Sequence, residues 1–201
     1  MPGERIRVDL PSEIDGVRAD FASALGVGRA LALGLVDRRL PVAVRYPVVG
    51  SVAWAFGSLV AQLQADVAGP LTKREMVEKR RRLAALFVMH IRLDAAALTA
   101  PAALQEQIEL LSRVFGAPAR PCLVGVMRPA SARARLRGML GGLALYTALR
   151  DQFDEDWYRN PRSDEPLIDA ARQGGATSVE ALVELLGGDL SAPAARLGEW
   201  L

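Results

Sequence analysis

Few side chains in this sequence are of the types that metal, nucleophilic or acid-base chemistry requires. The 201 residues include one histidine, His90, and one cysteine, Cys122. A zinc site with two histidines and an intrachain disulfide are therefore both excluded, and a Ser-His-Asp or Cys-His catalyst would have to form around His90. We expect His90 to be a core or boundary histidine with one hydrogen-bonded nitrogen, because it lies in an apolar run. Cys122 is expected to be a small buried hydrophobic residue.

A run of three acidic residues is the second place where chemistry could occur. Asp154, Glu155 and Asp156 are consecutive, and a pair of carboxyl groups can act as general acid and general base. A stand-alone small enzyme that uses His90 or this run is therefore one interpretation. It requires those side chains to lie in a cleft.

Charge and hydropathy exclude other classes of function. The chain has 25 basic and 23 acidic residues, a net charge of +2, and this balance argues against a nucleic-acid partner. The basic run over residues 79–82 covers the full circumference of a helix, so we interpret it as solvated charge. The longest apolar stretch, residues 21–36, contains Arg29 and three glycines and is too short to span a bilayer. No signal peptide is evident, so we expect a cytoplasmic protein without membrane contact.

The elements that must position these residues are predicted to be mainly helices. Hydrophobic residues, mostly Ala, Leu and Val, make up 51% of the chain, which favours a closely packed helical bundle in a single domain. Polar and apolar residues alternate over 4–10 and predict one N-terminal β-strand. Residues 37–50, with two prolines, predict an extended connector with scope for another short strand. Helices are expected over residues 12–36, 51–67 (capped by Ser51), 72–98, 101–115 and 131–153, and short C-terminal helices over 163–173, 178–186 and 191–201.

Three segments resemble the zinc peptidases of the oligoendopeptidase and thimet oligopeptidase family, in the family's order. Residues 23–32 (SALGVGRALA) resemble its zinc-binding helix, of the form Leu-His-Glu-Gly-Gly-His-Ala-Leu-His. Residues 46–60 (YPVVGSVAWAFGSLV) resemble the helix that supplies its third zinc ligand. Residues 145–162 (LYTALRDQFDEDWYRNPR) resemble its aromatic-rich C-terminal segment. The resemblance implies a fold like the C-terminal catalytic half of a zincin-type peptidase.

The positions that carry the family's chemistry are all replaced in this chain. The resemblance places the two histidine ligands at Leu25 and Arg29, the catalytic glutamate at Gly26 and the third ligand at Trp54. None of these side chains can ligate zinc or activate water. The resemblance therefore implies a catalytically dead relative without metal or cofactor. It also implies that the family's large N-terminal portion is missing, because the chain begins just before the former zinc helix.

A vacated metal site predicts a site for a peptide that is bound but not cleaved. Zinc peptidases commonly hold substrate as an added strand at a sheet edge, and residues 4–10 lie where the resemblance would place that edge. The candidate peptide-binding residues are Arg5, Arg7, Arg29, Tyr46, Trp54, Arg133 and Arg135.

Several candidates also have an ordinary structural interpretation. Arg29 would hold a peptide carboxylate, or it would pair with Asp20 or Glu13 on the surface. Trp54 would offer a flat face to a peptide side chain, or it would belong to the core. The predicted helix over 131–153 would present either a cationic wall or a solvated basic face, formed by Arg133, Arg135 and Arg137.

The sequence thus predicts a non-catalytic peptide-binding pseudoenzyme, with ribosomal peptide natural-product biosynthesis as one setting in which it would guide a precursor peptide. The alternative is a pseudo-subunit that pairs with an active metallopeptidase and regulates it. Apolar surface that the missing portion would have covered predicts an interface, either in a homodimer or with a client segment.

Overall fold

The computed structural model describes residues 16–45, 50–67, 73–99, 129–190 and 193. Within these ranges the chain forms seven α-helices and two short 3₁₀ helices, and they contain no strand. The elements are α1 (Gly16–Leu35), α2 (Val42–Arg45), α3 (Ser51–Asp66), α4 (Lys73–Thr99), α6 (Pro129–Phe153), η3 (Trp157–Arg159), α7 (Pro161–Arg172), η4 (Gly174–Ala176) and α8 (Val179–Leu185). The predicted mainly helical character is confirmed for the described residues. The predicted strand over 4–10 and the predicted helix over 101–115 lie outside them.

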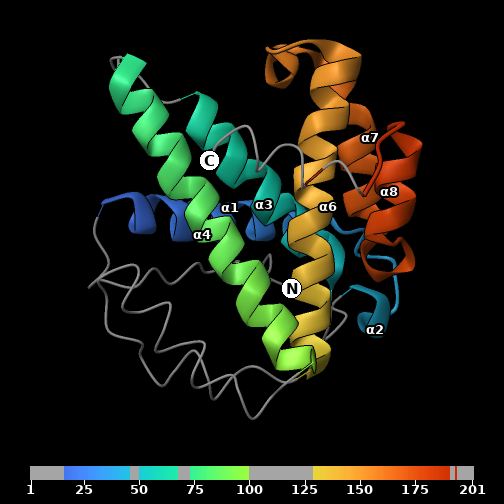
Figure 1. The fold of residues 1–201 in the computed structure, drawn as a ribbon. Coiled ribbons are helices and arrows are strands. Elements are labelled where there is room, and N and C mark those ends of the chain that lie inside the picture. Colours follow the sequence, from blue (N-terminus) through green and yellow to red (C-terminus); the bar gives the residue numbers. More distant parts are fainter. Residues whose placement is uncertain (1–15, 46–49, 68–72, 100–128, 191–192, 194–201) are drawn as a thin grey trace.

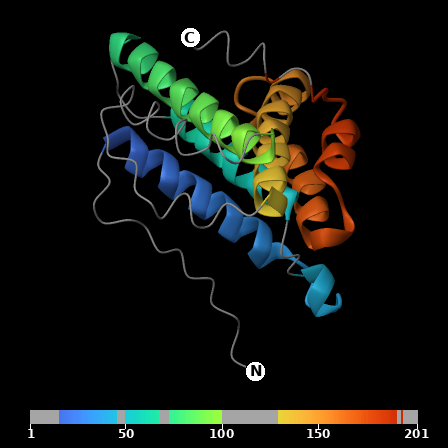
Figure 2. The same cartoon turned by 60° about the horizontal axis from the view of Figure 1, so that its bottom comes forward.

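Helix α3 is the centre of the arrangement, and it packs most extensively against α6 and α1. Helices α7 and α8 lie together beside α6, on the side away from α4 (Figure 1). The same grouping is visible when the molecule is turned (Figure 2). One hydrophobic core joins α3 and α6 to η3, α7 and α8, and a second joins α1 and α4 to α3 and α6. Helices α3 and α6 therefore contribute to both cores.

Glycines allow these helices to approach one another closely. A Cβ atom on Gly28 of α1 would lie 2.3 Å from the Phe56 carbonyl oxygen of α3. A Cβ atom on Gly142 of α6 would lie 2.4 Å from the Ala55 carbonyl oxygen, also of α3. Real side chains do not tolerate such distances, so the observed spacing of the three helices requires glycine at these positions.

Two fully buried polar side chains of α3 are bonded to the backbone of α6. The Ser58 hydroxyl donates to the Met139 carbonyl at 2.9 Å, and the Gln62 amide donates to the Gly142 carbonyl at 3.0 Å. Buried polar groups are costly unless they are hydrogen-bonded. These bonds therefore favour one register of α3 against α6.

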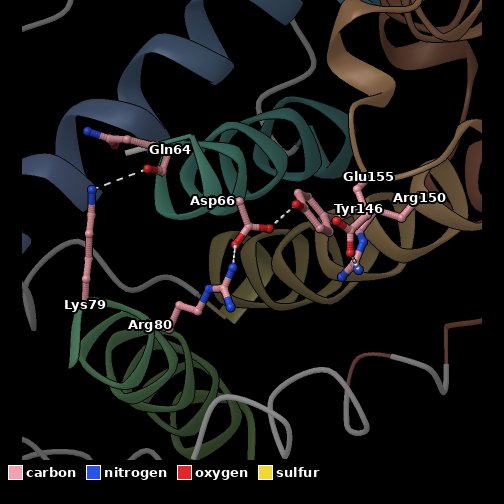
Figure 3. A network of polar contacts seen from close by, with 7 residues as sticks. All are labelled: Gln64, Asp66, Lys79, Arg80, Tyr146, Arg150 and Glu155. Carbon is pink, nitrogen blue, oxygen red and sulfur yellow. Dashed lines mark hydrogen bonds and ion pairs between the residues drawn. The ribbon is translucent and has the colours of Figure 1, made fainter. Parts of the chain in front are cut away.

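Asp66, at the C-terminal end of α3, links this helix to two others. Its carboxylate accepts a hydrogen bond from the Tyr146 hydroxyl of α6 and pairs with Arg80 of α4 at 3.1 Å (Figure 3). Nearby, Lys79 of α4 donates to the Gln64 carbonyl of α3 at 3.3 Å. Together these contacts fix this end of α3 relative to α4 and α6.

Two details of the predicted connector are wrong. Residues 42–45 form the short helix α2 instead of an extended segment, because the Pro41 carbonyl accepts hydrogen bonds from the amides of Val44 and Arg45. Proline suits the start of a helix, since its φ angle is already helical and its missing N–H is not needed there. The cap of α3 is Gly50, and Ser51 is the first helical residue.

We expect Gly142→Ala to lower the free energy of unfolding by about 1–3 kcal/mol, since the added methyl group would force α3 and α6 apart. Gly34→Ala is the matched control, because Gly34 is exposed near the end of α1 and alanine there favours the helix. Urea unfolding monitored by circular dichroism measures both. A Gly142→Ala protein as stable as the Gly34→Ala protein would contradict this account of the packing.

Candidate functional site

A pocket of about 600 Å³ opens beside the N-terminal end of α3. Helices α1, α2, α3, α6 and α7 contribute to its wall, together with η4 and the residues just before α8. Its charged lining consists of four arginines, and no Asp or Glu occurs among the described residues that line it: Arg29, Arg45, Arg135 and Arg137. The pocket is therefore suited to an anion.

Arg29 of α1 lies on the indole ring of Trp54 of α3. The guanidinium carbon is 3.9 Å from the ring centroid, a cation-π contact worth about 0.5–2 kcal/mol. Glycines make room for both side chains: a Cβ atom on Gly57 would lie 3.1 Å from Cγ of Arg29, and one on Gly138 would lie 2.3 Å from Cβ of Trp54. The close packing of the helices thus also shapes the site.

The positive charge of Arg29 is not neutralised within the part of the chain that the structure describes. No ion pair to Arg29 occurs there, and its Nε atom is buried without a hydrogen-bond partner among those residues. Burial lowers the pKa of Arg29, and the positive charge of Arg135 lowers it further. An arginine nevertheless stays protonated in proteins, so this buried donor would gain from a bound anion.

Arg135 of α6 is held by a buried carboxylate of α4. Its Nε atom donates to both oxygens of Asp94 at 2.8 Å, and its Nη2 atom also contacts this carboxylate. The Asp94 side chain is 1% exposed. Burial raises the pKa of Asp94, and the hydrogen bonds and charge of Arg135 offset only part of this rise. These bonds hold the guanidinium carbon of Arg135 at 5.6 Å from the centroid of the Trp54 ring.

Arg137, two residues further along α6, is paired with Glu180 of α8. Both Nε and Nη2 of Arg137 reach the same oxygen, Oε1, at 2.7 Å. Burial acts to raise the pKa of Glu180, but hydrogen bonds from groups that include Arg137 lower it overall. Unlike the Asp94 pair, this one is open to solvent, with side chains 51% and 35% exposed.

The structure brings three of the predicted site residues together: Arg29, Trp54 and Arg135 line one pocket. Arg133 is exposed and does not line it. Arg5, Arg7 and Tyr46 lie outside the described residues. Arg29 and Trp54, two of the positions that the sequence resemblance assigns to zinc ligands, are in direct contact. Leu25, the third such position, is buried in the core that joins α1 and α4 to α3 and α6.

Asp94 is the main site residue that sequence reasoning missed, although the sequence contains a signal for it. Leu83, Phe87 and Ile91 form an apolar stripe at helical spacing, and Asp94 continues the stripe three residues later. An acidic residue on a buried helix face needs a cationic partner. Arg45 gives no comparable signal, because it lies within the predicted connector over 37–50 and not on a predicted helix.

The other candidates lie elsewhere. Asp154, Glu155 and Asp156 are exposed outside the pocket, and Glu155 pairs with Arg150 at 3.0 Å. Within the described ranges, no group of three or more His, Cys, Asp or Glu side chains is arranged to hold a metal ion. Among the described helices, none is long and apolar enough to cross a membrane.

One helix face presents apolar side chains to solvent. Val27, Leu31 and Leu35 of α1 are spaced four residues apart, and each is at least 39% exposed. Side chains at this spacing share one face of a helix. The predicted homodimer stays a prediction.

The described part of the chain is a helical protein with an arginine-lined pocket. Comparison of the chain with protein-family models, with curated proteins and with solved structures finds no match. The relationship to oligoendopeptidases therefore stays a prediction from the sequence.

His90 provides a test of the electrostatics around Arg135. Burial and the positive charge of Arg135 lower the pKa of His90 to about 4, and its ring lies 5.5 Å from that of Phe21. The folded protein keeps the His90 imidazole neutral down to about pH 4, whereas in the unfolded chain it takes up a proton near pH 6.5. We therefore expect the free energy of unfolding to fall as the pH drops from about 6.5 towards 4.

An NMR titration measures this directly, since the chain has one histidine and its imidazole signals need no assignment. A midpoint near pH 4 is expected. A midpoint near pH 6.5 would show that Arg135 and the surrounding core do not act on His90 in this way.

Proposed function

We propose that this protein binds an acidic peptide, or an acidic extended segment of another protein, without cleaving it. The observation that carries the proposal is the state of Arg29: its guanidinium lies on Trp54 in a pocket, its Nε atom is buried, and it has no ion-pair partner among the described residues. A ligand carboxylate would supply that partner.

The chemistry of the lining favours a carboxylate on a partly apolar ligand. A guanidinium offers two parallel N–H donors that match the two oxygens of a carboxylate. Ala32 and Leu33 of α1, with Val36 just after it, form an apolar part of the same wall, so the anion would be attached to a group with aliphatic surface. An acidic peptide residue with apolar neighbours has this character, and the volume of the pocket is within the range of ligand sites.

The sequence resemblance gives the proposal its second support. It assigns Arg29 and Trp54 to zinc-ligand positions of a peptidase, and these two side chains do meet in the pocket. A protein that kept the substrate region and lost the zinc ligands would hold a peptide without hydrolysing it. Guidance of a precursor peptide in ribosomal natural-product biosynthesis belongs to this proposal as its setting.

The test uses three fluorescein-labelled, C-terminally amidated heptapeptide pools, in which all remaining positions vary among uncharged residues. The single-glutamate pool has glutamate at its fourth position, and the glutamine pool has glutamine there. Fluorescence polarisation should show binding of the single-glutamate pool and much weaker binding of the glutamine pool. The third pool, the two-glutamate pool, carries a second glutamate at the sixth position and is used below.

Arg29→Gln should weaken binding of the single-glutamate pool about tenfold or more, because a hydrogen bond to a charged group is worth about 1.5–3 kcal/mol. Trp54→Ala should weaken it as well, since Arg29 would lose the ring on which it lies. The matched control is Arg133→Gln, which removes the same charge from an exposed position outside the pocket and should leave the affinity almost unchanged. Absence of binding, or equal losses for Arg29→Gln and Arg133→Gln, would contradict the proposed function.

A further inference from the structure

The arginines of the pocket differ in how firmly their charge is already engaged. Arg29 has no ion-pair partner among the described residues, and Arg135 is fully engaged by Asp94 through both carboxylate oxygens. Arg137 is an intermediate case: it lines the pocket, but its guanidinium is engaged by Glu180, which does not line it.

The contact between Arg137 and Glu180 is weaker in geometry than the buried pair. Both donors of Arg137 converge on Oε1 of Glu180, whereas a two-pronged pair would use both oxygens. The other oxygen, Oε2, is buried and has no hydrogen-bond partner among the described residues. An incoming carboxylate that met Arg137 with both oxygens would make the better pair.

Exposure makes such an exchange feasible. The Arg137 side chain is 51% exposed and that of Glu180 is 35% exposed, against 17% and 1% for Arg135 and Asp94. Exposed ion pairs contribute little to stability, while removal of one partner from a buried pair is strongly destabilising. Of these two arginines, Arg137 can therefore change partners and Arg135 cannot.

Resting on the proposed function, we propose that Arg137 is a second carboxylate-binding residue of the pocket, and that Glu180 is its built-in competitor. The preferred ligand is then a peptide with two acidic groups, one held by Arg29 and one that displaces Glu180 from Arg137. A ligand with a single carboxylate binds at Arg29 and leaves the pair between Arg137 and Glu180 intact.

The experiment measures the affinities of the single-glutamate and two-glutamate pools by fluorescence polarisation. The two glutamates are two positions apart, so they lie on the same side of an extended peptide. The wild-type protein should prefer the two-glutamate pool. Glu180→Gln should strengthen binding of that pool about two- to fivefold, the range set by the loss of a competing exposed ion pair, and should change the single-glutamate affinity much less.

Glu184→Gln is the matched control, because Glu184 is an exposed residue of the same helix and its replacement removes the same charge. Arg137→Gln in the Glu180→Gln background should abolish the gain. Equal gains for Glu180→Gln and Glu184→Gln, no gain for Glu180→Gln, or a gain that survives Arg137→Gln would each overturn the inference. Thermal melts confirm that the variants are folded.

The two proposals fail in different ways. If Arg29→Gln weakens binding but Glu180→Gln brings no gain, the pocket binds one carboxylate and only the inference about Arg137 is wrong. If Arg29→Gln has no effect on either pool, the proposed function itself is wrong, and the inference falls with it.

Discussion

The close approach of α1, α3 and α6 is the constraint on which the rest of the structure depends. Glycines at the two crossings, Gly28 against α3 and Gly142 against Ala55 and Ser58, allow backbone contact that any larger residue would prevent. The same packing creates the site, because Gly57 leaves room for the stem of Arg29 and Gly138 leaves room for Trp54. A helical bundle with larger residues at these positions would hold its helices further apart, and the cation-π contact at 3.9 Å would be lost.

The two ends of α3 differ in how far the charged side chains around them are paired. At its C-terminal end, Asp66 is engaged by Tyr146 and Arg80. About 18 Å away along the helix, Trp54 lies in the pocket among arginines whose charges only partly find acidic partners. Native proteins rarely leave a desolvated charge without compensation. A partly buried charge without an acidic partner among the described residues is a feature often found at ligand sites.

The helical fold was predictable from the sequence because its signals are local. Capping residues, stop signals and apolar spacing predict helices over 51–67, 72–98 and 131–153, and the structure places them at α3, α4 and α6 with ends within two residues. The prediction of an extended connector was wrong at residues 42–45, because Pro41 fits either an extended segment or the first turn of a helix. For the site, Arg29, Trp54 and Arg135 were predicted. The carboxylates that pair with some of the pocket's arginines and not with others were not predicted. Asp94 and Glu180 are 41 and 43 residues away from their arginines, and sequence patterns do not encode such long-range pairing.

In the proposed function, Arg29 is a cation whose missing partner is a ligand carboxylate. The most direct test is the ¹H–¹⁵N signal of the Arg29 side-chain Nε–H group, identified by its disappearance in Arg29→Lys. As the single-glutamate pool is added, this signal should shift and its exchange with water should slow, because the buried donor gains an acceptor. A peptide that saturates the protein and leaves the Arg29 signal unchanged would contradict the central claim.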